Sequence, residues 1–426
     1  MGHRAREDGQ PPHALPARWP RPLAGGGHPL ARRRGRKGPG ALPQPLRHRA
    51  RPTAALPGVP VNPLSRRLLS VPLLLSLALA GCGDSQGTTL RSAFLGELGE
   101  KSILPTYRDF DTRTGTLATA LTELERTPTE ATLATAQSAW RAVREPWGIQ
   151  EALHIGPSEE LHTGAAVDQV PSTSGIDSLL AGTTPLTEQS VGELGANRKG
   201  MMAMEYVLFD SQAGNAAVLT RLTEGDAGAR RRAYLRALGA VLHTNAVEVH
   251  NAWEPDQGNY VAQLASAGTS GSKYATQKEA VDEIVNRLIG SVEVAELKLS
   301  KPLGFETGGT VRPEEEEARR SDNSLADLTH ALVGMERLWT GPEGNGGLAR
   351  VVAATNKNLD TTVRGELAAV RSALESIPPP LRTALLQNRE SVEAARAALS
   401  NLRATLASEV VANLGVTLKF NDNDGD

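Results

Sequence analysis

The chain is poor in cysteine, in aromatic residues and in recognisable catalytic motifs. It contains one cysteine among 426 residues, so no disulfide can form within a single chain. Aromatic residues make up 4% of the sequence, and no alternating pattern long enough for a β-strand stands out. The chain has no glycine-rich nucleotide fingerprint, no His-Glu-x-x-His motif and no Ser-His-Asp order, which removes the usual signs of nucleotide-dependent, zincin-type and triad enzymes.

Positive charge is scarce in most of the chain. Residues 1–60 contain 12 of the 46 Lys and Arg residues against only two acidic ones, and Arg66 and Arg67 follow. From Cys82 onward, 32 basic residues face 46 acidic ones, which gives a net charge near -14. Nucleic-acid binding requires clustered basic side chains, so we expect no nucleic-acid partner.

Residues 1–60 are rich in Pro, Arg and Gly and show no apolar periodicity. Such a segment cannot bury enough apolar surface to fold, so we predict a disordered basic leader. A basic arm for RNA or a membrane is one interpretation. A misplaced translation start, with the true start near Val61, is the other, and the segment that follows favours it.

Residues 61–81 have the pattern of a secretory signal. Arg66 and Arg67 precede the apolar run from Leu68 to Ala80, which is too short to span a bilayer and ends in Leu79-Ala80-Gly81-Cys82. This ending resembles the bacterial lipobox, in which the chain is cut before an acylated cysteine. We therefore predict a lipoprotein signal peptide over 61–81, a membrane anchor on Cys82, and a tether over 82–94. Gly83 after the cysteine favours sorting to an outer membrane.

The remaining sequence predicts an all-α fold. One helix opens at Thr127, with Pro128 at its first position and Glu130 completing a capping box, and stops at Pro146. Another runs from Gly228 to Trp253, and further helices are expected at 274–300, 324–340, 346–376 and 380–413. Gly- or Pro-containing loops separate these helices at 156–175, 182–187, 268–272 and 303–313, and the last of them is the expected boundary between two helical bundles.

Several blocks of sequence resemble one family. They span roughly residues 95 to 426, in the family's order. They are Ser138 to Trp147, Glu151 to Gly156, Gly200 to Phe209, Asn259-Tyr260, Ser321 to Asp327, and Leu414 to Asp422. Together they are similar to imelysin-like proteins.

The resemblance implies two packed helical bundles with an interbundle cleft, in a protein of the periplasm or cell surface. It also implies a link to metallopeptidases and to iron-regulated uptake. The family's Gly-x-His-x-x-Glu signature matches at Gly200 and Glu205, but Met202 stands where the signature has histidine. Ser321 and Asp327 belong to the same set of expected cleft residues.

The exchange of histidine for Met202 changes the chemistry of the expected site. A histidine and a glutamate three residues apart share one helix face and could hold a divalent metal or iron together. A thioether suits Cu(I) instead, so Met201, Met202 and Met204 form either a copper site or core filling. The Glu205 carboxylate must face the cleft or meet a cation, for which Arg141, Arg144 and Arg198 are candidates.

Other histidines offer substitute ligands. Glu151 and His154 form a Glu-x-x-His pair with metal-compatible spacing, so Glu205, Glu151 and His154 are the predicted metal ligands. His330 follows Asp327 by three residues and could pair with it. His243 and His250, seven residues apart, are too widely spaced for one metal.

Two functions remain open. The first is an envelope lipoprotein, held at the membrane by acylated Cys82, whose cleft binds a metal complex, a peptide or an envelope protein partner, in uptake of iron or another metal. The alternative is a metal-dependent peptidase of the imelysin type. The peptidase requires His154 or His330 to lie within ligand reach of a site shared with Glu205, and Met202 favours the first function.

Overall fold

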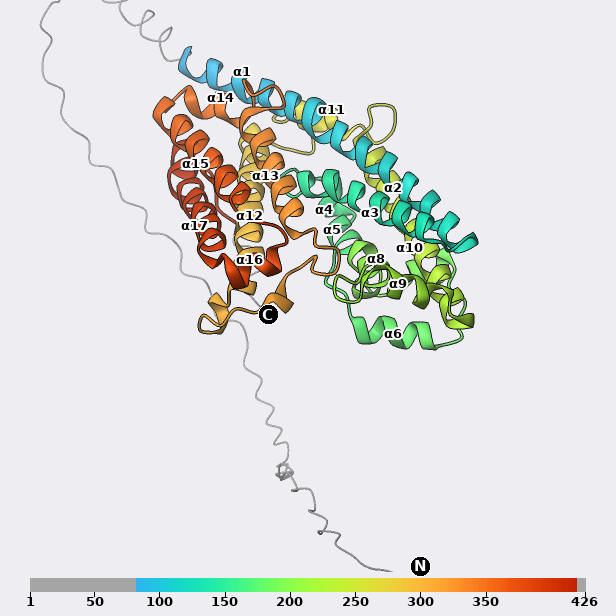
Figure 1. Cartoon of the computed structure of the whole chain (residues 1–426). Helices are drawn as coiled ribbons and strands as arrows, with labels where there is room; N and C mark the ends of the chain where they lie inside the picture. Colours follow the sequence, from blue (N-terminus) through green and yellow to red (C-terminus); the bar gives the residue numbers. More distant parts are fainter. Residues whose placement is uncertain (1–81, 420–426) are drawn as a thin grey trace, which may run out of the picture. The chain divides into compact units, whose positions relative to one another are not determined.

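The computed structural model describes residues 82–419, and the predicted leader (1–60) and signal peptide (61–81) lie outside this range. Within it every regular element is helical, which confirms the all-α prediction (Figure 1). The long helices are α1 (Cys82–Glu97), α2 (Leu104–Arg126), α3 (Glu130–Gln150), α10 (Gly225–Trp253), α12 (Gln277–Leu303), α13 (Ser324–Thr340), α15 (Lys357–Glu375) and α17 (Arg389–Thr405).

Shorter helices connect the long ones. They are α4 (Pro157–Glu160), α5 (Thr163–Val167), α6 (Thr173–Ala181), α7 (Glu188–Gly192), α8 (Gly200–Leu208), α9 (Gly214–Thr223), α11 (Tyr260–Ala265), α14 (Gly347–Ala353), α16 (Leu381–Gln387) and α18 (Val411–Leu414). A π-helical segment, Leu98–Ile103, joins α1 to α2, and a second, Leu406–Val410, joins α17 to α18. Three short 3₁₀ turns occur at Ala196–Arg198, Phe305–Thr307 and Pro313–Glu315.

The buried hydrophobic residues form two clusters. The C-terminal core draws on α1, α11 to α17 and the adjoining ends of α2, α3 and α10. The N-terminal core draws on the remainder of those three helices with α5 to α9. In α2, for example, Tyr107 belongs to the C-terminal core and Phe110 to the N-terminal one. Because α2, α3 and α10 each contribute side chains to both cores, these three helices connect the two cores.

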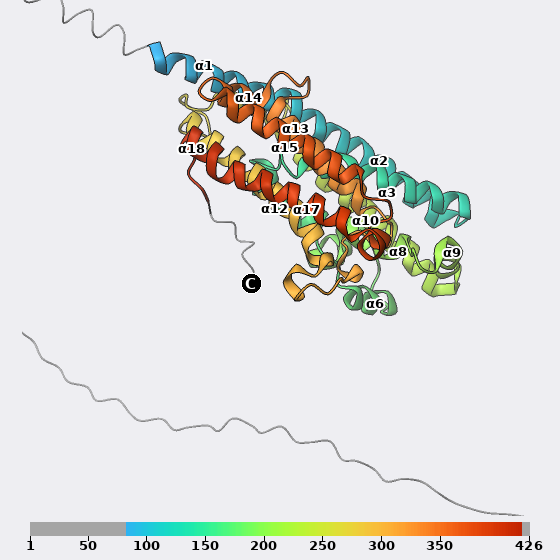
Figure 2. The same cartoon turned by 60° about the vertical axis from the view of Figure 1, so that its left-hand side comes forward.

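Helices α12, α13, α15 and α17 pack side by side around the C-terminal core (Figure 2). The loop at 303–313, where the sequence predicts a boundary between bundles, joins α12 to α13, and both of these helices contribute to the C-terminal core. The change from one core to the other falls instead within α2, α3 and α10. A glycine-rich loop between neighbouring helices of one core has the same sequence pattern as a loop between bundles.

Helix α3 differs at both ends from its prediction. Its N-cap is Thr129 rather than Thr127, and Thr132 supplies the reciprocal hydrogen bond expected of Glu130. The helix also continues through the buried Pro146 to Gln150. A proline removes the hydrogen bond to the carbonyl four residues earlier, and the Arg113 guanidinium donates to that carbonyl of Ala142 at 2.9 Å.

The N-terminal segment is more ordered than a tether. Residues 82–94, predicted as a tether, lie within α1, which packs against α11 and α14 and buries Phe94 and Leu95. Burial of these apolar side chains stabilises a helix where a sequence rich in Gly, Ser and Thr favours none. In the described range, no helix combines the length and hydropathy needed to cross a bilayer.

The other predicted helices agree closely with the structure. The helix expected from Gly228 to Trp253 is α10, and those expected at 274–300 and 324–340 are α12 and α13. The segments 346–376 and 380–413 are each divided, into α14 and α15 and into α16 to α18. The loop expected at 156–175 contains α4, α5 and the start of α6.

Candidate functional site

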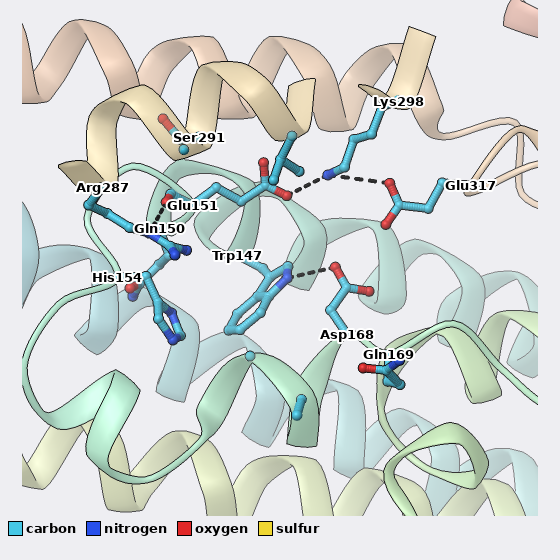
Figure 3. Close-up of a pocket in the computed structure, with 14 residues that line it drawn as sticks. Trp147, Gln150, Glu151, His154, Asp168, Gln169, Arg287, Ser291, Lys298 and Glu317 are labelled. Atoms are coloured by element: carbon cyan, nitrogen blue, oxygen red, sulfur yellow. Dashed lines mark hydrogen bonds and ion pairs between the residues drawn. The ribbon is translucent and has the colours of Figure 1, made fainter. Parts of the chain in front are cut away.

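A pocket of about 370 Å³ lies between the C-terminal end of α3 and one face of α12 (Figure 3). Helix α3 supplies Trp147 and Gln150, and Glu151 and His154 follow in the turn after it. We call this cavity the α3–α12 pocket. Its opposite wall comes from α12, and Asp168, after α5, and Glu317 complete it.

The α12 side of the pocket is largely polar. Arg287, Ser291 and Lys298 are separated by four and seven residues, so they lie on one side of the helix. The Lys298 ammonium bonds the Glu151 carboxylate and lies 3.3 Å from Glu317. Burial opposes charge on Lys298, but these two carboxylates raise its pKa, so it remains a cation.

Part of the pocket wall has hydrogen-bonding atoms without partners. The Gln150 side chain is 1% exposed, and neither its amide nitrogen nor its amide oxygen has a hydrogen-bond partner among the described residues. The same holds for Glu151 Oε2, although Glu151 Oε1 bonds Lys298. Native proteins rarely leave such atoms unsatisfied, so this corner of the pocket is chemically incomplete.

Arg287 and His154 set the charge at that corner. Arg287 Nε donates to the Glu151 carbonyl at 2.7 Å, yet no carboxylate of residues 82–419 lies within ion-pair distance of its guanidinium. Burial lowers the Arg287 pKa. Burial, and then the charge of Arg287, lower the pKa of His154 to about 3, so this imidazole is neutral at physiological pH.

A second group of residues behind the pocket is fully connected. Arg144, 1% exposed, donates two hydrogen bonds to Asp327, at 3.0 and 2.9 Å, and contacts both oxygens of Asp168 at 2.8 Å. The indole of Trp147 also donates to Asp168, at 2.7 Å, and the Asn323 amide donates to Asp327. Burial raises the pKa of Asp168, and Arg144 opposes that shift.

The family-signature residues join this group. Met202 Sδ lies 3.8 Å from Arg144 Nη1. Glu205 Oε1 accepts from the Ser321 hydroxyl at 2.8 Å and from the backbone N–H groups of Ser321 and Arg320. We call Arg144, Met202, Glu205, Ser321 and Asp327 the signature network.

Two close approaches hold this network in place. Gly200 has a φ of +78°, and a Cβ there would lie 2.4 Å from the Val167 carbonyl oxygen, which explains the glycine at the start of α8. Helices α3 and α13 cross so closely that a Cβ on Gly334 would lie 2.2 Å from the Ile149 carbonyl oxygen. This crossing brings Asp327 of α13 to Arg144 of α3.

Glu205 also lines a second pocket, of about 590 Å³, which shares Val294, Lys298 and Glu317 with the α3–α12 pocket. The carboxyl is 1% exposed. Burial raises its pKa to about 7, against the hydrogen bonds from Ser321. None of Arg141, Arg144 and Arg198, the cations proposed from sequence, forms an ion pair with Glu205 within 82–419; Ser321 and Arg320 satisfy its oxygen instead.

The predicted metal ligands are not brought into one site. Glu151 and His154 line the α3–α12 pocket and Glu205 lines the second one. Over the described range, no three His, Cys, Asp or Glu side chains are arranged to hold a metal ion. A divalent cation at the signature positions would meet the Arg144 guanidinium beside Met202, and one at Glu151 would compete with Lys298. These residues do not fit a divalent-metal site.

The remaining histidines have separate surroundings. His330 does not pair with Asp327: Arg144 and Asn323 occupy that carboxylate, and His330 Nδ1 has no hydrogen-bond partner in the described structure. His243 and His250 both approach Asp111, at 3.5 and 2.7 Å, which links α10 to α2. Sequence spacing alone gave no sign of the carboxylate between these two histidines.

Several pocket residues were not identified from sequence: Gln150, Asp168, Arg287, Lys298 and Glu317. One signal was present, because polar residues recur on a single face of the predicted helix at 274–300. The missing partners of Gln150 carry no sequence signal, since they depend on how α3 meets α12.

The chain resembles known proteins over most of its length. Residues 103–408 match the family profile described as imelysin, peptidase family M75. A protein named iron-regulated protein A, from Synechococcus elongatus, is 28% identical over 341 residues, which cover 78% of this chain and 89% of the relative.

Two solved structures are similar in fold. One is described as an iron-regulated protein A precursor from Parabacteroides distasonis, with a TM-score of 0.65 and 20% identity over 77% of this chain and 95% of the other. The second is an imelysin-like protein from Psychrobacter arcticum, with a TM-score of 0.62 and 17% identity over 78% and 98% of the two chains. At these identities, the two structures support the fold alone.

Proposed function

Since this chain belongs to the imelysin family, we propose that it is a lipid-anchored protein of the bacterial cell envelope that binds a small polar ligand in the α3–α12 pocket. The ligand class includes metal complexes and peptides, and the role is uptake of iron or another metal, with or without an envelope protein partner. The similarity to a protein named iron-regulated protein A supports the link to iron.

One observation carries the binding proposal. Gln150 is almost completely buried at the pocket wall, and neither polar atom of its amide has a partner within residues 82–419. A buried polar group left unsatisfied costs about 1–3 kcal/mol. A leucine would fill similar space without that cost, so a glutamine here is best explained by a ligand that completes its hydrogen bonds.

The signature network supports the same assignment. Glu205 holds the Arg320–Ser321 turn through three hydrogen bonds, and Met202 packs beside Arg144. These contacts fix the arrangement of α3, α8 and α13 around the pocket. In this chain the signature positions stabilise the fold, and the neighbouring pocket is the place for a ligand.

Binding is tested on the full chain purified in detergent. After incubation with Fe, Zn, Cu or Mn salts, with ferric complexes or with short peptides, bound metal is measured by mass spectrometry and bound ligand by calorimetry. We expect a stoichiometric ligand whose binding is lost in Gln150→Leu and retained in Glu205→Gln, which keeps the acceptor oxygen for Ser321 and Arg320. Stoichiometric metal lost in Glu205→Gln would instead indicate a metal at the signature residues, and no ligand in any sample would overturn the proposal.

The anchor is tested separately through Cys82. We expect wild-type protein in the membrane fraction, labelled by a fatty-acid analogue, and the Cys82→Ser variant unlabelled and released from the membrane. Loss of an acyl anchor removes about 0.8 kcal/mol per buried CH₂. Ser85→Ala is the matched control, and an unlabelled wild-type protein would contradict the anchor.

The alternative function is a metal-dependent peptidase of the imelysin type, although its predicted ligands Glu205, Glu151 and His154 are divided between two pockets. Its supporting observation is the Glu205 carboxyl, whose pKa of about 7 suits proton transfer near neutral pH. Chelator-sensitive peptide hydrolysis that is abolished in Glu205→Gln would support the peptidase. Hydrolysis that is absent from wild type under all four metals would contradict it.

A further inference from the structure

Three residues at one corner of the α3–α12 pocket have polar atoms without a hydrogen-bond or ion-pair partner in the described structure. Gln150 offers an amide N–H₂ donor and a carbonyl acceptor, and Glu151 offers the free acceptor Oε2. Arg287 offers guanidinium N–H groups with no carboxylate opposite them in the described structure. The Arg287 Nε bond to the Glu151 carbonyl, at 2.7 Å, ties the donor and acceptor sides together.

These groups specify a ligand with an anionic acceptor close to an N–H donor. Arg287 with Gln150 Nε2 matches a carboxylate, because a guanidinium presents parallel N–H groups that fit its two oxygens. Glu151 Oε2 with Gln150 Oε1 matches an ammonium or another N–H group. Gln150, Glu151 and Arg287 line the same pocket and lie beside one another in Figure 3, so the two halves of the ligand must also be close to each other.

The charge of the site restricts the ligand further. The pocket and the signature network behind it hold five carboxylates, Glu151, Asp168, Glu205, Glu317 and Asp327, and three cations, Arg144, Arg287 and Lys298. His154 is neutral because burial and Arg287 lower its pKa. Arg144 and Lys298 are paired with carboxylates of the protein, whereas no carboxylate of residues 82–419 forms an ion pair with Arg287. One ligand carboxylate at Arg287 is therefore compensated, and a second anionic group would be desolvated without compensation.

We propose that the α3–α12 pocket recognises an α-carboxylate with an N–H donor on the adjacent carbon, the chemistry of a free amino acid or of a peptide's C-terminal residue. Arg287 and Gln150 Nε2 bind the carboxylate, and Glu151 Oε2 with Gln150 Oε1 binds the nitrogen. A volume of about 370 Å³ is at the lower end of the range for small-molecule sites, which suits a ligand of this size. This inference depends on the proposed binding function and names its ligand.

The test uses the full chain in detergent and isothermal titration calorimetry with the twenty L-amino acids. For the tightest binder, the matched probes are its N-acetyl derivative, which keeps the N–H and represents a peptide C-terminus, and its des-amino acid, in which hydrogen replaces the amino group. We expect at least one amino acid to bind, and the des-amino acid to bind more than about tenfold weaker, as loss of a hydrogen bond to a buried charged group predicts.

Variants locate the site. Gln150→Leu and Arg287→Met should each weaken binding more than about tenfold. Arg287→Lys, which keeps the charge, should lose less than Arg287→Met. Gln212→Leu, at an exposed position outside this pocket, is the matched control. Thermal unfolding of each variant separates loss of binding from loss of fold.

The outcomes distinguish the inference from the proposed function. Equal binding of the des-amino acid, or amino-acid binding that survives Gln150→Leu, overturns the inference. Binding of a ferric complex but of no amino acid or peptide overturns it too and leaves the proposed function intact. No binding by any probe overturns both. Tighter binding of the N-acetyl form identifies a peptide C-terminus as the source, and tighter binding of the parent identifies a free amino acid.

Discussion

The signature network and the unpartnered corner of the α3–α12 pocket both depend on α3, which supplies Arg144 to the network and Gln150 to the corner. Around Arg144 and Glu205, each interacting carboxylate meets a guanidinium, a hydroxyl or backbone N–H groups. Around Gln150, the amide and one glutamate oxygen lack partners in the described structure. The signature positions therefore hold helices together, whereas the open polar atoms belong to Gln150 and Glu151, which lie outside those positions.

The signature network and the open corner of the pocket contribute differently to the stability of the fold. A satisfied buried network is costly to break, because removing one member leaves its partners charged and desolvated. An unsatisfied group costs stability only until a ligand binds. Substitutions in the two regions should consequently change the free energy of unfolding in opposite directions, and this difference is measurable.

The largest expected effect is in the network. Arg144→Met should lower the free energy of unfolding by about 3–5 kcal/mol, since Asp168 and Asp327 would remain buried without their shared cation. Urea denaturation monitored by circular dichroism measures this change. The control is Arg126→Met, whose side chain is 74% exposed and whose replacement should change stability by less than about 0.5 kcal/mol. Equal effects of the two substitutions would show that Arg144 does not hold the network together.

A smaller effect is expected from Glu205. Its pKa is raised by burial from 4.5 to about 7, so the folded state favours the protonated carboxyl. The resulting stability is fully present below about pH 4.5 and is lost as the pH rises through 7. Glu205→Gln keeps the acceptor oxygen for Ser321 and Arg320 and removes the charge.

Stability measured from pH 4 to pH 8 tests this difference. Relative to Glu205→Gln, wild type should lose about 3 kcal/mol over that range, the equivalent of a shift of about 2.5 units. The exposed Glu248→Gln is the control and should follow the wild-type pH dependence. Parallel curves for wild type and Glu205→Gln would mean that Glu205 stays ionised in the folded state.

Much of the fold could be predicted from sequence, because apolar residues recur at helical spacing along α10, α12 and α13. Details that depend on neighbouring helices could not. The passage of α3 through Pro146 needs Arg113 of α2 to satisfy the Ala142 carbonyl. The helix over 82–94 needs α11 and α14 to bury Phe94.

Some residues of the site could likewise be predicted from sequence, and others could not. The resemblance led to Glu205, Ser321 and Asp327, which the structure places in one network with Met202. It could not show that their polar atoms are satisfied by Arg144 and by the Arg320–Ser321 backbone. Nor could it identify Gln150, whose importance lies in partners that are missing from the folded chain.

The smallest expected effect has the opposite sign. Without ligand, Gln150→Leu should leave the protein as stable as wild type or more stable by about 1 kcal/mol, because it removes two unsatisfied buried atoms at similar volume. With a saturating ligand, wild type should become the more stable of the two, since a ligand stabilises only a protein that binds it. Thermal unfolding of both proteins with and without ligand measures this crossover. If Gln150→Leu is destabilised even without ligand, the amide already has a partner in solution, such as an ordered water, and the contrast between a satisfied network and an open pocket fails at its central residue.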